Sequence, residues 1–335
     1  MHATLFLLTV ITLFFTSPIL AQYPKSPKRG LVSVSTNNPQ DEPIFVKPNN
    51  GLTWYYNYGI SPTPAYINIS QSEIEFVPML WGVSNVTGST FLKNVTSMID
   101  KGRNISHVLS FNEPDVNFTA KGSQVSPDAA AASWILNFDP LRKMGIKVGA
   151  PVVYANDTGF AWLDKFYAAC NKRKSNCTAD FMNIHVFGNT SVIDAYLTKY
   201  KKKYPGKPLW ISEFALDYSP VLETEAAFNE TIAMFDNDTA VERYAYFGSF
   251  RSSDSGVGWN ATMLDGIGEL TNIGSWYLGG GIVKDATATK TSSSSEATSS
   301  TKDSGAAAWS GGRGGRREML GMMIISIVLA VGLQT

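Results

Sequence analysis

The sequence predicts a single (β/α)8 TIM barrel, an α/β fold of eight parallel strands, and three observations support this prediction. Short runs rich in β-forming residues alternate with longer helix-compatible segments, a pattern typical of βα units in a parallel sheet. Eight such runs occur, which is the number at which right-handed βα crossovers close a barrel. The segment that carries them, residues 27–283, has the usual length of one barrel domain.

Each predicted strand is a short apolar or β-rich run bounded by polar, Gly or Pro residues. In chain order the predicted strands are Arg29–Val32, Thr53–Tyr56, Glu75–Leu80, His107–Phe111, Lys147–Ala150, Phe181–Val186, Pro208–Ser212 and Arg243–Phe247. An open, doubly wound sheet is the alternative arrangement of the same units. It is less favoured because no Gly-rich phosphate loop follows the first strand.

Three segments between the fourth and the seventh strand have clear helical patterns. Pro127–Leu136 is rich in alanine, and Ser126 directly before it is a suitable N-cap. Trp162–Ala169 and Ile193–Tyr200 place apolar side chains on one face at helical spacing. Helices at these places complete the alternation of strand and helix that a barrel requires.

The N-terminal segment is predicted to be a targeting signal. Leu5–Leu20 is an almost unbroken apolar run that is short for a membrane span. Residues 1–21 are therefore expected to be a secretory signal peptide, cleaved after Ala21. A retained membrane anchor is the alternative.

The C-terminal segment has the composition of a stalk followed by a lipid-anchor signal. Residues 284–304 are rich in Ser, Thr and Ala, which predicts an O-glycosylated stalk without a core. Residues 305–335 contain a basic spacer and the apolar tail Met319–Leu333. Small residues, then a spacer, then an apolar tail are typical of a GPI-attachment signal, with Ser304 as the predicted anchored residue. A tail-anchored helix is the alternative, although the tail is short for a full span.

Sequons and cysteines predict the same secretory route. The density of Asn-X-Ser/Thr triplets predicts a glycosylated surface protein. They begin at Asn68, Asn85, Asn94, Asn104, Asn117, Asn156, Asn176, Asn189, Asn229, Asn237 and Asn260. The only cysteines, Cys170 and Cys177, are closely spaced and are expected to form a disulfide that closes one surface loop. Two free thiols are the alternative.

Composition argues against several other classes of protein. The formal net charge at pH 7 is +0, so the sequence gives no reason to expect nucleic acid as a partner. After removal of the signal peptide only His107 and His185 remain as histidines, without a Cys/His cluster at metal-ligand spacing. No metal or other cofactor is therefore expected, and a monomer is the simplest assembly.

Two glutamates at strand ends carry the functional prediction. Glu113 follows the fourth predicted strand within Phe111–Asp115, and Glu213 follows the seventh within Trp210–Ala215. The carboxyl ends of parallel strands meet on one face of a barrel, however far apart they lie in sequence. Two facing carboxylates are the usual means of cutting a glycosidic bond. The alternative is that both glutamates are surface residues in loops.

An Asn-Glu pair after the fourth strand and a lone Glu after the seventh resemble the arrangement in retaining glycosidases of the large clan of (β/α)8 hydrolases, and this resemblance implies how the roles divide. We expect Glu113 to be the general acid and then the base, Glu213 to be the nucleophile, and Asn112 to bind the sugar 2-hydroxyl. Carboxyl groups about 5 Å apart would indicate a retaining mechanism, and a separation nearer 8 Å an inverting one.

Other side chains at strand ends are candidates for substrate binding. Aromatic rings stack on the weakly apolar face of a sugar, so Trp54, Tyr56 and Trp81 are expected substrate contacts. A core position is the alternative for each of them. His185, at the end of the sixth strand, is expected to bind a sugar hydroxyl or to orient Glu213, again with a core role as the alternative.

Eight segments, in order through nearly the whole predicted barrel, resemble glycoside hydrolase family 128, the fungal family whose catalytic core is called alkali-sensitive-linkage-protein-like. They are Lys28–Leu31, Trp54–Tyr58, Phe76–Trp81, Phe111–Asp115, Gly149–Pro151, Trp162–Leu163, Asp180–Phe181 with His185, and Trp210–Ala215. The resemblance implies a retaining β-1,3-glucan hydrolase with Glu113 as acid/base and Glu213 as nucleophile. Phe187 departs from the family pattern, in which a tyrosine often occupies that position.

The prediction is thus an endo-β-1,3-glucanase, secreted and GPI-anchored, that remodels β-glucan at a fungal cell wall or at the outer face of the plasma membrane. A β-1,3-glucan transglycosylase would use the same carboxylates, with a second glucan in place of water. A wall-glucan-binding protein without turnover is the alternative from a different class.

Overall fold

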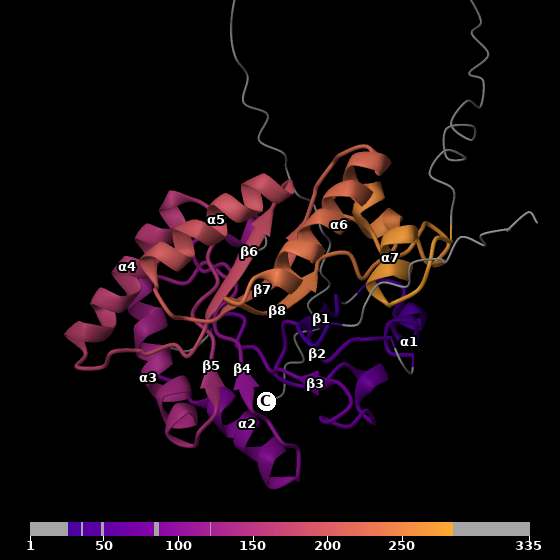
Figure 1. The fold of residues 1–335 in the computed structure, drawn as a ribbon. Coiled ribbons are helices and arrows are strands. Elements are labelled where there is room, and N and C mark those ends of the chain that lie inside the picture. Colours follow the sequence, from indigo (N-terminus) through magenta and orange to yellow (C-terminus); the bar gives the residue numbers. More distant parts are fainter. Residues whose placement is uncertain (1–25, 35, 48–49, 84–86, 121, 284–335) are drawn as a thin grey trace, which may run out of the picture.

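The computed structural model describes residues 26–34, 36–47, 50–83, 87–120 and 122–283 (Figure 1). The predicted signal peptide, the stalk and the GPI signal with Ser304 lie outside these residues, and so does Asn85. Within the described part of the chain, no helix has the length and apolar character needed to cross a membrane.

Parallel strands form the centre of the described fold. They are β1 (Arg29–Val32), β2 (Trp54–Tyr56), β3 (Glu75–Phe76), β4 (His107–Val108), β5 (Lys147–Val148), β6 (Met182–Phe187), β7 (Leu209–Ala215) and β8 (Val241–Tyr246). Hydrogen bonds order them as β3-β2-β1-β8-β7-β6 in one sheet and β4-β5 in a second. Every strand lies within or beside the segment that predicted it.

Two isolated bridges join the two sheets into a ring. Met79, shortly after β3, pairs in parallel with Leu109, directly after β4. Gly149, directly after β5, pairs in parallel with Phe181, directly before β6. Because β1 also pairs with β8, each strand has a neighbour on both sides. The predicted (β/α)8 barrel is therefore confirmed.

Helices cover the outside of the ring, most densely around its second half (Figure 1). They are α1 (Glu42–Phe45), α2 (Thr90–Asp100), α3 (Pro127–Lys143), α4 (Asp157–Lys172), α5 (Thr190–Lys203), α6 (Val221–Asn237) and α7 (Asn272–Tyr277). The first two crossovers contain only the short α1 and 3-10 turns. Ser126 caps α3 as predicted, since its side chain accepts a hydrogen bond from the Ala129 amide.

The disulfide predicted from the cysteine spacing is confirmed. Cys170 and Cys177 are bonded, with Cα atoms 5.8 Å apart, and close the loop between α4 and β6. Both half-cystines are buried. The sequon asparagines within the described residues are exposed, except for the half-buried Asn229, so their glycosylation is sterically open and stays a prediction.

A charged cluster fills the barrel at the N-terminal ends of the strands. The Glu75 carboxylate lies 2.6 Å from Arg243 Nη2 and 2.9 Å from His107 Nδ1. The Arg243 guanidinium lies over the rings of Trp54 and Trp210, 5.7 and 4.3 Å from their centroids. Burial opposes the charge of Glu75, but the hydrogen bond from His107 and the charge of Arg243 outweigh it and lower the pKa of Glu75 to about 2.

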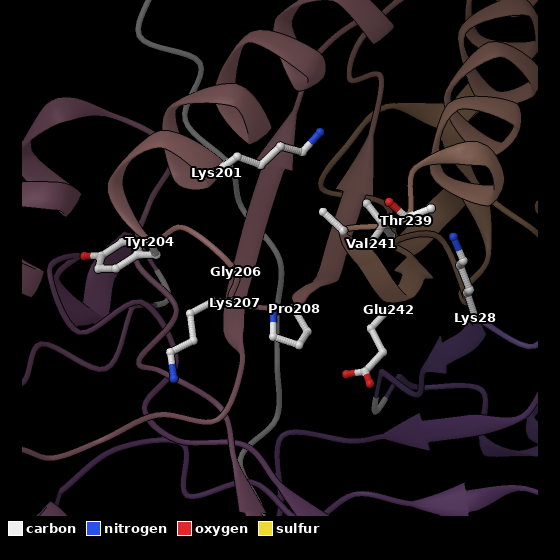
Figure 2. A pocket seen from close by; sticks show the side chains of 10 residues that line it. Lys28, Lys201, Tyr204, Gly206, Lys207, Pro208, Thr239, Val241 and Glu242 are labelled. Carbon is white, nitrogen blue, oxygen red and sulfur yellow. The ribbon is translucent and has the colours of Figure 1, made fainter.

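A pocket of about 540 Å³ opens around the start of β7 and β8, and basic side chains are prominent in its lining (Figure 2). The charged side chains of this pocket already have partners within the chain. The pairs are Lys28 with three carbonyls at the end of α6, Lys201 with Asp238, Lys207 with the Ala179 carbonyl, and Glu242 with the Trp210 indole. These contacts tie the ends of α5 and α6 to the barrel, and we assign the pocket a structural role.

The charged cluster generates a prediction about stability. Replacing Arg243 with leucine leaves the buried Glu75 carboxylate without its strongest cation, which should lower the free energy of unfolding at pH 7 by about 3 kcal/mol. The double variant Arg243→Leu/Glu75→Gln removes both charges and should recover part of this loss. Urea unfolding of the three proteins measures the difference. An Arg243→Leu protein as stable as the native one would contradict the assignment.

Candidate active site

The two glutamates predicted to be catalytic come together at the C-terminal end of the barrel. Glu113 lies in the loop after β4, and Glu213 lies near the end of β7. The His185 ring from β6 lies between them, with Nδ1 3.0 Å from Glu113 Oε1 and Nε2 3.2 Å from Glu213 Oε1. One oxygen of each carboxylate and a ring nitrogen all lie within 4.8 Å of one another. One imidazole therefore contacts both carboxylates.

Strand register puts His185 in this position. β6 and β7 pair so that His185 lies directly opposite Glu213, after an irregularity in the pairing between Ile184 and His185. The side chain is only 1% exposed. Burial lowers the pKa of His185, but the charge of Glu213 and the hydrogen bond with Glu113 outweigh burial and raise it. The imidazole thus favours holding a proton between the two acids.

Two tyrosine hydroxyls hold Glu213 from the other side. Tyr58 donates a hydrogen bond of 2.6 Å to Glu213 Oε1, and the Tyr56 hydroxyl lies 3.4 Å from the same oxygen. Burial raises the pKa of Glu213 to about 7, against the charge of His185 and the tyrosine hydrogen bonds. Burial and the charge of Glu213 also raise the pKa of both tyrosines, so their hydroxyls remain donors.

Tyr58 was missed as a site residue from the sequence. It lies two residues beyond Tyr56, outside β2, and its φ of 61° is left-handed, so strand alternation does not place its side chain. The signal that could have found it is the run of aromatic residues at the end of the second predicted strand. Of the two tyrosines, Tyr58 makes the shorter contact to Glu213.

The backbone is strained at two residues of this site. Glu113 has a φ of 41° and Tyr58 a φ of 61°. Both values lie in the left-handed region, which residues other than glycine rarely adopt. Each such residue costs about 1–3 kcal/mol and persists only where neighbouring contacts hold it. The Glu113 amide is held by the Val152 carbonyl at 2.8 Å. The backbone strain thus lies at Glu113 itself and at Tyr58, the residue that hydrogen-bonds Glu213.

Asn112 brings an unused acceptor to the same place. Its side chain is buried, and its Oδ1 has no hydrogen-bond partner among the described residues. Its backbone amide donates to the Trp81 carbonyl at 2.9 Å, which fixes it beside Glu113. A buried acceptor without a donor is costly unless a ligand supplies one.

The three aromatic residues predicted to contact substrate lie in different environments. Trp81 is half-buried beyond β3, and its ring centroid lies 6.0 Å from that of Phe118, whose side chain is 60% exposed. Tyr56 is fully buried, so it reaches Glu213 rather than a substrate. Trp54 is also fully buried and packs on Trp210 at the opposite end of the barrel, so it leaves the candidate site.

Comparison with known proteins identifies the family. Residues 30–277 match the model of the glycosyl hydrolase catalytic core. The chain belongs to this family. Alkali-sensitive linkage protein 1 of Schizosaccharomyces pombe is 28% identical to it over 262 residues, which cover 76% of this chain and 44% of that protein. The chain thus spans less than half the length of this relative.

Solved structures of glycoside hydrolase family 128 share the fold, and the predicted resemblance to this family is confirmed. An endo-β-1,3-glucanase from Sorangium cellulosum is 26% identical, with a TM-score of 0.60 over 77% of this chain and 100% of that chain. An oligosaccharide-binding protein from Trichoderma gamsii is 21% identical, with a TM-score of 0.58 over 77% of this chain and 96% of that chain. The second likeness concerns the fold alone.

The raised pKa of Glu213 predicts a stability that depends on pH. The unfolded chain releases this proton near pH 4.5, whereas the folded protein keeps it until about pH 7. The folded state therefore binds more protons in this window, and stability falls as pH rises through it. The variant Glu213→Gln should be more stable than the native protein above pH 7, by about 2–3 kcal/mol, and equal to it near pH 4.

Thermal unfolding of the native protein and of Glu213→Gln at several pH values between 4 and 8 measures this difference. A Glu213→Gln protein no more stable than the native one at pH 8 would show that burial does not destabilise the Glu213 carboxylate.

Proposed function

We propose that the protein is a retaining glycoside hydrolase that cleaves β-1,3-glucan internally and takes part in fungal cell-wall remodelling. The observation that carries this proposal is the contact of His185 with both glutamates, whose oxygens lie within 4.8 Å. Retaining glycosidases hold their two carboxyl groups about 5–5.5 Å apart, whereas inverting enzymes need about 6.5–9.5 Å to admit a water molecule. The glucan class rests on the β-1,3-glucanase among the relatives.

In the first step, Glu113 gives its proton to the glycosidic oxygen while a Glu213 oxygen attacks the anomeric carbon. The bond from that carbon to the leaving oxygen breaks, and an ester forms on Glu213. Before this step, the proton on His185 Nδ1 passes to Glu113 Oε1, 3.0 Å away, so that Glu113 becomes the acid and the neutral imidazole keeps its proton on Nε2, 3.2 Å from Glu213 Oε1. The same imidazole thus supports a protonated acid and an ionised nucleophile.

In the second step, Glu113 takes a proton from a water molecule, and the oxygen of that water molecule attacks the anomeric carbon. The ester bond breaks, and Glu213 leaves as a carboxylate that Tyr58 and Tyr56 stabilise. Asn112 Oδ1 accepts a hydrogen bond from the sugar 2-hydroxyl, which fills its empty acceptor position. A glucan hydroxyl in the place of water would convert the same steps into transglycosylation.

Trp81 and Phe118 provide the aromatic surface beside this site. Their rings lie 6.0 Å apart at an interplanar angle of 33°, and both keep accessible area. A pyranose ring can stack on such a surface through its C–H face. We assign the pair to glucan binding next to the Asn112–Glu113 end of the site.

The central experiment incubates the purified protein with linear β-1,3-gluco-oligosaccharides and follows the products by mass spectrometry. We expect shorter oligosaccharides with the native protein and none with Glu213→Ala, because the variant lacks the nucleophile. Products longer than the substrate would identify a transglycosylase. Folded native protein that binds the oligosaccharides without turnover would contradict an enzymatic role and favour a wall-glucan-binding protein.

For the location, we propose a secreted protein held at the outer face of the plasma membrane or in the cell wall by a GPI anchor. Support comes from the apolar N-terminal run, the Ser/Thr-rich segment 284–304 and the order of small residue, spacer and apolar tail. Accessible sequon asparagines within the described residues fit the same route.

The anchor is tested by treating cells with a phosphatidylinositol-specific phospholipase. We expect the enzyme to release the protein from membranes, and a chain that ends at Ser304 to appear in the medium without treatment. Membrane association that persists in both cases would rule out the GPI anchor.

A further inference from the structure

A short loop segment clasps the backbone of Glu113. The Glu113 carbonyl accepts hydrogen bonds from the Val116 amide at 3.0 Å and from the Ser123 amide at 3.2 Å. The Ser123 amide also lies 3.0 Å from the Asn112 carbonyl. We call Val116, Gly122 and Ser123 the clasp. It holds the carbonyl side of Glu113, while Val152 holds its amide.

Gly122 lets the clasp close. A Cβ atom at this position would lie 2.3 Å from the Val116 carbonyl oxygen and 2.6 Å from the Glu113 carbonyl oxygen. Both atoms belong to the backbone, so neither can turn away as the end of a side chain could. Gly122 is buried, and its amide donates to the Asn117 carbonyl at 3.0 Å. Any side chain at position 122 must therefore push the clasp away from Glu113.

We propose that Gly122 is a positioning residue for the acid/base Glu113. Its missing side chain lets the clasp hold Glu113 at a φ of 41°, the backbone conformation that accompanies a contact of 3.0 Å from Oε1 to His185 Nδ1. Without the clasp, the strained backbone would relax toward negative φ and carry the carboxyl group away from His185. This inference rests on the acid/base role proposed above for Glu113.

The two glutamates share the contact with His185, but the clasp holds only the Glu113 side, which makes the proposal specific. Glu213 is part of β7 and is fixed by Tyr58, and neither contact involves the clasp. Displacing the clasp should therefore weaken proton donation to the leaving group and leave the attack by Glu213 nearly intact. Kinetically, this is the signature of a damaged general acid rather than of a damaged fold.

The test compares Gly122→Ala with Glu113→Gln on β-1,3-glucosides whose leaving groups differ in acidity. For both variants we expect a fall of about 10–100-fold in kcat/KM on unactivated oligosaccharides. On a dinitrophenyl glycoside, which needs no proton from the enzyme, kcat/KM should change less than about threefold. Azide should raise the turnover of both variants on this activated substrate.

Two other glycines provide matched controls. A Cβ atom at Gly274 in α7 would lie 2.1 Å from the Met263 carbonyl oxygen, so Gly274→Ala is as crowded but does not touch Glu113. We expect it to lower stability without changing the dependence on the leaving group. A Cβ atom at Gly266 would make only an ordinary contact of 3.6 Å with Ser252 Oγ, so Gly266→Ala should resemble the native protein.

Ser123→Gly decides the matter if Gly122→Ala does not fold. It adds backbone freedom to the clasp without a clash, and the Ser123 hydroxyl has no partner among the described residues. We expect the same selective loss on unactivated substrates, of about threefold or more. Folded variants whose losses are equal for all leaving groups, or absent, would overturn the role of Gly122.

Glu113→Gln separates this inference from the proposed function. If that variant shows no dependence on the leaving group, the acid/base assignment and the role of Gly122 both fail. If it shows the dependence and the clasp variants do not, the acid/base assignment stands and only the role of Gly122 fails.

Discussion

The contact of one buried imidazole with two carboxylates is the interaction on which the site depends. Two carboxylates this close repel each other when both are ionised, and burial makes that repulsion stronger. His185 reduces this repulsion because its pKa is raised, so that the ring can carry a proton between the two carboxylates. The tyrosines at Glu213 and the backbone contacts at Glu113 then hold each acid in its place.

Each end of the barrel holds a buried glutamate beside a histidine, but the pKa of the glutamate is lowered at one end and raised at the other. At the N-terminal end, Arg243 and His107 lower the pKa of Glu75 to about 2, so its charge is fully compensated. At the C-terminal end, no arginine in the described part of the chain contacts Glu213, and burial raises the pKa of Glu213 to about 7. The first arrangement favours stability. The second costs stability but leaves a carboxylate that can gain and lose charge, as the nucleophile proposed for this site must.

Sequence patterns predicted the strands and the two glutamates because both depend on local periodicity and on the order of βα units. They did not show that Trp54 lies away from the candidate site. The end of the barrel at which a strand residue lies depends on the register and the length of the strand. Tyr58 lies beyond its strand, and its contact with Glu213 depends on a left-handed backbone. The clasp around Glu113 is made of loop residues, whose contacts do not follow the periodicity of a strand or a helix. The role of Gly122 could therefore be inferred only from the structure.

The most direct test of the account is the configuration of the first sugar released from a β-1,3-glucan oligosaccharide, followed by proton NMR before the anomers equilibrate. Carboxylate oxygens within 4.8 Å of each other leave no room for an attacking water molecule between the nucleophile and the sugar, so the β-anomer should appear first. Initial release of the α-anomer would show an inverting enzyme and contradict the roles given to Glu113 and Glu213.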